Sequence, residues 1–252
     1  MIRIVVSRLT VHILRGALLC ALLVGCAIPL MPYRSVYEDP VNYVRLERDE
    51  TVLPEWPPSA HAHPKAMRME DVSRILGSIS VKEHRVWLQK KLQGEAPLIP
   101  AFGPEELTLL SQQIAVAFAA AKPDERVTFY LSQPQTSVKR IITTGGLYIH
   151  GTELHFILGN WQVLYGIPSY GMVYDRRYPM RPTAAKGFHL YFYPAEATIT
   201  QQHSLWDTLL ANTTDELVID LMKTGSGPLA SLAGYGKTQL MPKTWLEFSV
   251  LR

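Results

Sequence analysis

The stretch from residue 138 to 158 constrains the fold more than any other, because it has the pattern of a β-hairpin. Gly151 and Thr152 form a two-residue connection with glycine first, as a type II′ turn requires. In the register that this turn sets, one face carries Leu147, Ile149, Leu154 and Phe156. The opposite face carries Tyr148, His150, Glu153 and His155. A slip by one residue would mix the two sets, so the turn and the alternation predict the same register.

The other periodic stretches place helices early in the chain and strands after them. A helix is expected over 104–121, where Pro104 suits the first helical position and Glu105 and Glu106 favour the positive helix start. Shorter helices are expected near 68–77 and at 204–211, and strands at 79–83, 127–131, 188–193, 217–221 and 245–250. This order predicts an α+β domain of mostly antiparallel sheet built from hairpins, with two or three helices packed on one face.

The first 25 residues differ in character from the rest of the chain. Arg3, Arg8 and Arg15 form a basic start without an acidic residue, and an apolar run over 16–25 follows. The run is shorter than the roughly 20 residues that span a bilayer, but it suits the apolar region of a signal peptide. It ends on Leu23-Val24-Gly25-Cys26, which resembles the lipobox of bacterial lipoproteins.

This resemblance implies that residues 1–25 are a signal peptide and that Cys26 receives a diacylglycerol and becomes the first residue of the mature chain. Attachment through more than one acyl chain would be stable. Ala27, rather than Asp, at the next position resembles lipoproteins sorted to the outer membrane. The expected location is therefore the cell envelope, with the domain facing the periplasm and the membrane as a partner. An ordinary signal peptide or N-terminal anchor with an incidental cysteine is the alternative.

Removal of that segment changes the charge and the cysteine content. The chain has 25 Lys and Arg against 22 Asp and Glu, and loss of the three arginines leaves 22 of each sign. No basic excess remains to indicate a nucleic-acid partner. Both cysteines, Cys20 and Cys26, lie in or at the end of the processed segment, which excludes a disulfide or a cysteine nucleophile from the mature body.

No catalytic motif is found in the sequence. Residues 231–238 end like a phosphate-binding loop, but Ser231 stands where that motif needs glycine. Neither Gly-x-Ser-x-Gly nor His-Glu-x-x-His occurs. No cofactor is expected.

Proline content divides the mature chain into a tether and a domain. Seven of the 18 prolines fall within 27–65, and proline opposes regular pairing and favours extended chain. We therefore expect the lipidated cysteine and a Pro-rich tether over 26–65, and a single α+β domain over 66–252. Apolar side chains in the tether could dock on the domain.

Histidines supply the metal candidates, which are His61, His63, His150 and His155. The first two precede Met67 and Met69, and imidazole with thioether suits copper. The other two share a hairpin face with Glu153, so three ligands could converge on zinc. The alternatives are two histidines carried by a tether, and a solvated hairpin surface.

The segment 161–193 predicts a binding surface. It holds nine of the chain's 24 aromatic residues together with a basic cluster, broken into loops by Gly and Pro. Tyrosine and arginine are favoured contact residues. The binding candidates are Tyr170, Tyr174, Arg176, Arg177, Tyr178 and Arg181. Their partner would be an envelope protein, a glycan or a lipid head group, and the alternative is a loop that packs its aromatics over the sheet edge.

Three functions follow from these patterns. The first is a non-catalytic binding or assembly module of the envelope that uses segment 161–193. The second is an envelope enzyme acting on a glycan or lipid. The third is a periplasmic protein that handles copper or zinc.

Overall fold

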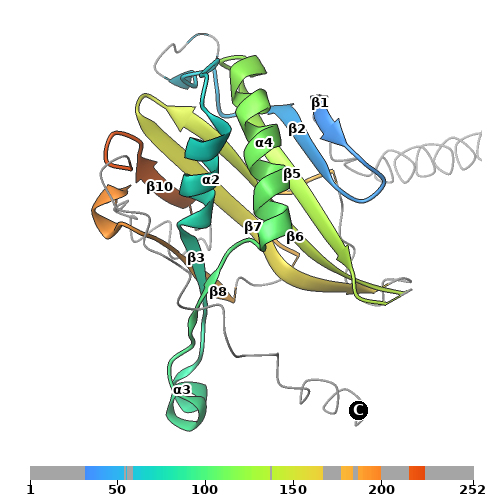
Figure 1. Cartoon of the computed structure of the whole chain (residues 1–252), viewed down its shortest axis with the longest axis vertical. Coiled ribbons are helices and arrows are strands. Elements are labelled where there is room, and N and C mark those ends of the chain that lie inside the picture. The colour runs from blue at the N-terminus through green and yellow to red at the C-terminus, as the bar shows by residue number, and fades with distance from the viewer. Residues whose placement is uncertain are drawn as a thin grey trace, which may run out of the picture. The chain divides into compact units, whose positions relative to one another are not determined.

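The computed structural model describes residues 32–53, 55, 59–136, 138–166, 177–183, 187–199 and 216–224. Within them, a seven-stranded sheet has the order β1-β2-β5-β6-β7-β10-β9 and a three-stranded sheet the order β4-β3-β8 (Figure 1). The large sheet comprises β1 (Tyr33–Glu38), β2 (Tyr43–Arg48), β5 (Glu125–Pro134), β6 (Lys139–His150), β7 (Glu153–Gly166), β10 (Glu216–Asp220) and β9 (Thr198–Ile199). The small sheet comprises β4 (Leu98–Pro100), β3 (Ile79–Glu83) and β8 (Phe188–Phe192), and a 3-10 helix spans Ala195–Ala197. Every pairing is antiparallel, so the predicted α+β class is confirmed.

The predicted hairpin is confirmed as β6 and β7, with the expected register. Tyr148 pairs with His155 and Ile149 with Leu154, and Gly151 has a φ of +58° in the turn. The expected core face, Leu147, Ile149, Leu154 and Phe156, is at most 2% exposed. The pattern held because turn chemistry and alternation are both local properties of this segment.

Two helices cover one face of the large sheet (Figure 1). α2 (Met69–Gly77) and α4 (Pro104–Ala120) pack against each other, and α4 contacts β1, β2 and β5. The Gly103 N–H donates to Glu106 Oε2 at 2.9 Å, which satisfies a backbone donor at the start of α4. Leu110, Ile114 and Phe118 of α4 are at most 1% exposed, as the helical spacing predicts.

The expectation of a tether over 26–65 is wrong for residues 33–48, which form β1 and β2. Val44 and Leu46 of β2 are buried in the main core, and β2 pairs with β5 from Tyr43 to Arg48. The prolines bracket two proline-free runs, 33–39 and 41–53, and these runs hold the strands. Proline content averaged over the whole segment therefore concealed two strands that satisfy the proline rule individually.

The third helix, α3 (Trp87–Gln93), lies between β3 and β4 and was not foreseen. None of its residues is buried, so it is not a third helix on the sheet. Figure 1 shows it at the end of a projecting arm formed with β3 and β4. Of the expected strands, 79–83 is confirmed as β3, and 127–131, 188–193 and 217–221 coincide with or overlap β5, β8 and β10. The expected helix at 204–211 and strand at 245–250 lie outside the described residues.

Among the residues that the structure describes, no helix has the length and apolar character needed to cross a bilayer.

Candidate functional site

Residues 59–65 lie alongside the end of β6 and bring two predicted histidines onto the sheet. The Ala62 N–H donates to the Ile149 carbonyl at 2.7 Å, and the His61 N–H donates to the Pro123 carbonyl at 2.9 Å. The His61 and His63 residues are only 6% and 5% exposed. This segment is therefore an ordered part of the fold, and its histidines are not carried by a tether.

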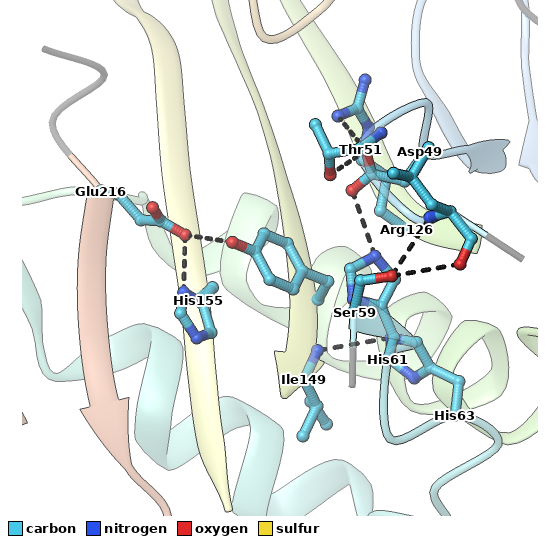
Figure 2. A network of polar contacts seen from close by, with 11 residues as sticks. Asp49, Thr51, Ser59, His61, His63, Arg126, Ile149, His155 and Glu216 are labelled. Carbon is cyan, nitrogen blue, oxygen red and sulfur yellow. Dashed lines mark hydrogen bonds and ion pairs between the residues drawn. The ribbon is translucent and has the colours of Figure 1, made fainter. Parts of the chain in front are cut away.

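His61 belongs to a largely buried polar group with Asp49 and Arg126 (Figure 2). Its Nε2 lies 3.1 Å from Asp49 Oδ2, and Arg126 Nη1 lies 3.4 Å from Asp49 Oδ1. Asp49 Oδ1 also accepts the N–H and the hydroxyl of Thr51. Burial favours the neutral carboxyl, but these hydrogen bonds and the Arg126 charge outweigh it and hold the pKa of Asp49 well below its usual range.

Tyr148 lies between two imidazoles. Its ring centroid is 4.5 Å from that of His61 and 4.5 Å from that of His155, and the His155 ring is nearly parallel to it. Glu216 Oε1 accepts the Tyr148 hydroxyl at 2.7 Å and the His155 Nδ1–H at 2.6 Å (Figure 2). Burial and the neighbouring Glu216 carboxylate together raise the pKa of the Tyr148 phenol. Asp49 thus holds the His61 imidazole, and Glu216 holds that of His155, whose Nε2 also lies 3.8 Å from Glu153 Oε2.

His63 has a different environment, on the α4 side of the same segment. Its ring stacks on Phe118 at 5.3 Å, and its Nε2 accepts the Ile149 N–H at 3.3 Å. An acceptor nitrogen carries no proton, so this hydrogen bond requires the neutral imidazole. Burial, followed by the charge of nearby His61, lowers the pKa of His63 to about 4.

The four predicted metal ligands do not converge on one point. His61 and His155 lie on opposite sides of Tyr148, while His63 packs on Phe118. The His150 ring centroid is 6.4 Å from that of His155. Across the described ranges, no group of three or more His, Cys, Asp or Glu residues is placed to hold a metal ion. The cluster is a largely buried polar network that connects Asp49, His61 and β10 to the hairpin.

A cavity of about 430 Å³ opens between the arm and the middle of β7. Its lining combines polar side chains of the arm with residues of β7 and of the chain that leads into β8. The arm provides Glu83, His84, Arg85, Gln89 and Gln93. The other side provides Gly159, Asn160, Trp161, Gln162, Val163, Thr183, Gly187 and Phe188. Residues from the first half of the chain and from segment 161–193 therefore line the same cavity.

Irregular pairing turns β7 toward this cavity. The register between β6 and β7 shifts on both sides of Thr144. Gln162 has a φ of +49°, which is rare for a residue other than glycine. Strand bulges re-aim side chains and recur beside binding sites. The Trp161 Nε1–H donates to the Ala101 carbonyl at 3.1 Å, so the indole is fixed in place.

Asn160 fastens the chain over the bulge. Its side-chain Nδ2 donates to Thr144 Oγ1 and to the Arg181 carbonyl, and its Oδ1 accepts the Thr183 N–H at 2.9 Å. A Cβ added at Gly159 would lie 2.5 Å from the Pro179 carbonyl oxygen, so glycine permits this close approach. The cavity wall is therefore preorganised by hydrogen bonds within the protein.

The binding residues predicted in 161–193 are only partly described. Tyr170, Tyr174 and Arg176 lie outside the described residues. Arg177 and Arg181 are exposed, and their guanidinium carbons lie 5.7 and 4.7 Å from the half-buried ring of Tyr178. These three residues are brought together, and the same segment supplies Thr183 and Phe188 to the cavity.

Sequence reasoning missed the arm and the bulge. Gly159-Asn160 within a strand pattern was the available signal for the bulge, because an isolated glycine there indicates irregular pairing. The arm residues gave no comparable signal, since their role depends on a strand pairing between β3 and β8 that joins residues more than 100 apart.

Residues 1–31, including Cys26, lie outside the described part of the chain. Comparison with family models, with curated proteins and with solved structures finds no match.

Proposed function

We propose that this chain is a lipid-anchored protein of the cell envelope, acylated at Cys26, that binds a hydroxyl-rich ligand of the glycan class in the cavity between the arm and β7. The anchor is supported by the lipobox-like residues 23–26. Binding is supported by one observation above all, the fixed bulge of β7 that presents Trp161 and Gln162 to a polar cavity.

The lining suits a sugar in its chemistry. Exposed Gln89, Gln93 and Gln162 line the cavity, and a primary amide offers both donor and acceptor to a hydroxyl group. Trp161 packs edge-to-face with Phe188 at 6.1 Å and provides an apolar surface beside the amides. A pocket with a few placed polar groups around an aromatic wall is the usual form of a small-ligand site.

The second candidate is an envelope enzyme that acts on the same ligand class. Glycoside hydrolysis generally uses two carboxylates on either side of the scissile bond. Glu83 is the carboxylate that the described lining residues supply. We therefore propose binding and make hydrolysis an outcome of the experiment.

The test measures binding of the purified full chain to peptide-free glycan strands released from peptidoglycan, by microcalorimetry. The variant Gln162→Gly with Gln93→Ala removes two amides, and glycine keeps the positive φ at position 162 without strain. Loss of two neutral hydrogen bonds should weaken affinity about tenfold. Gln112→Ala, an exposed glutamine on α4, is the matched control and should bind as the wild type does.

Equal affinity of the double variant and the wild type would exclude the cavity as the glycan site. New reducing ends in the wild-type mixture, formed more slowly with the variant, would support the enzyme hypothesis instead. Absence of wild-type binding contradicts the glycan class.

A further inference from the structure

The helix α3 exposes an unusual concentration of large apolar side chains. Val86, Trp87, Leu88 and Leu92 are 56%, 70%, 57% and 78% exposed, and no residue of the helix is buried. Isolated exposed apolar residues are common on protein surfaces, but a contiguous group usually marks a contact with another molecule. The group stands at the end of the projecting arm (Figure 1).

The two sides of α3 have different roles. Gln89 and Gln93, one helical turn apart, line the cavity. At about 100° per residue, Trp87, Leu88 and Leu92 fall on another part of the helix surface, an arc of roughly 140°. The apolar side therefore does not belong to the cavity, and it needs an explanation of its own.

Positive charge accompanies this apolar side. Residues 84–92 contain Arg85, Lys90 and Lys91 and no carboxylate. Lys91 Nζ lies 4.9 Å from the centroid of the Trp87 ring, so a cation stands within the apolar arc. Lys90 Nζ lies 3.4 Å from Glu95 Oε1, and the same carboxylate also forms an ion pair with Lys82. The tip thus combines apolar side chains with an excess of positive charge.

We propose that this tip inserts into the headgroup region of an anionic bilayer. Trp and Lys are side chains that place an apolar body in the acyl boundary and a polar end at the headgroups. A seven-residue helix is about 10 Å long, so it would lie within the interface and not span it. Lipid phosphates meet the charge of Lys91 there, whereas an apolar groove of a protein would have to supply a buried carboxylate. This contact goes beyond the proposed glycan binding and does not depend on it.

The test places an environment-sensitive nitrobenzoxadiazole dye on the tip of the full chain. Cys20 and Cys26 are changed to serine, and the dye is attached to Leu92→Cys or, as a control, to Leu164→Cys, which is 54% exposed on β7. The N-terminal apolar segment is the same in both proteins. Vesicles of phosphatidylcholine are compared with vesicles that also contain phosphatidylglycerol.

With anionic vesicles, the dye at position 92 should shift to the blue and brighten several-fold, and nitroxide lipids should quench it. The dye at position 164 should not change. Lys90→Glu with Lys91→Glu should raise the lipid concentration for half of the change about tenfold. The matched reversal Lys139→Glu with Arg140→Glu on β6 should leave it unaltered.

Three results would overturn the proposal. The first is a dye at position 92 that stays in water with both kinds of vesicle. The second is an equal response to neutral and anionic vesicles, which removes the role of charge. The third is a blue shift that grows with protein concentration without lipid, which assigns the tip to contact between copies of the chain.

Discussion

His63 occupies the place beside Ile149 where a neighbouring strand would supply a carbonyl group. Its Nε2 accepts the Ile149 N–H, and so the side chain completes the hydrogen bonding of a backbone group that is otherwise at the end of the ladder. A protonated imidazole cannot accept this bond. The stability of this corner is therefore coupled to a proton.

Stability should fall as the pH is lowered from about 6.5 to about 4 because of His63. Its pKa is 6.5 in its ordinary state and about 4 in the fold, where His61, Glu125 and Lys65 also act on it. Between pH 6.5 and pH 4 the His63 imidazole is protonated in the unfolded chain but neutral in the folded chain. Up to about 3 kcal/mol of unfolding free energy is therefore lost over this interval. Urea denaturation at pH 7 and pH 4.5 measures this loss.

The matched variant for that measurement is His63→Gln, whose amide oxygen can accept the Ile149 N–H and does not titrate. The variant should lose less stability than the wild type over the same pH interval. Equal losses in the two proteins would contradict the assignment and would show that groups other than His63 cause the loss in this pH interval.

The histidines show what single residues in a sequence can and cannot indicate. The pattern correctly placed Tyr148 and His155 opposite each other on one hairpin face. It did not indicate that the His61 ring contacts Tyr148, because that contact requires residues 61–63 to lie along the end of β6. Long-range placement of this kind leaves no periodic trace in the sequence, and so the same histidines suggested metal sites.

At the scale of elements, substitutions in the hairpin of β6 and β7 test which of its two faces is buried. Ile149→Asp would place a charge in the main core, and a buried unpaired charge commonly costs several kcal/mol. Thr152→Asp adds the same charge in the exposed turn and should change the unfolding free energy by no more than about 0.5 kcal/mol. Urea denaturation compares the two, and Ile149→Ala, at about 2–5 kcal/mol, serves if the aspartate variant does not fold. Similar losses for both positions would reverse the assigned faces.

β1, β2 and α3 were not predicted from the sequence, and the reasons differ. β1 and β2 were obscured by prolines that in fact mark their ends. α3 has only seven residues and none of them is buried, so its apolar side chains form too short a pattern to indicate a helix that packs on the core. The patterns are thus reliable where an element buries one face, and weak where the element projects from the body.

At the scale of the whole molecule, the order of strands is the property least accessible to local reasoning. The N-terminal β1 and β2 pair beside β5, and β10 pairs beside β7, so both edges of the large sheet are built from distant parts of the chain. The cavity also depends on distant parts of the chain, because its lining combines the arm with β7 and β8, and β3 of the arm pairs with β8. The class of fold followed from element order, but the site did not.

Attachment of the whole molecule to the membrane should depend on Cys26. In the proposed acylation, the Cys26 thiol of the lipobox-like sequence is the acceptor of the lipid, so Cys26→Ala would remove that acceptor. Labelling with radioactive palmitate should disappear and the chain should leave the membrane fraction, because several acyl chains together provide stable anchoring. Cys20→Ala, six residues earlier in the apolar run, is the matched control and should be labelled and retained as the wild type is. A Cys26→Ala chain that is still labelled and membrane-bound would show that the segment is an ordinary anchor, and the envelope location would then need separate support.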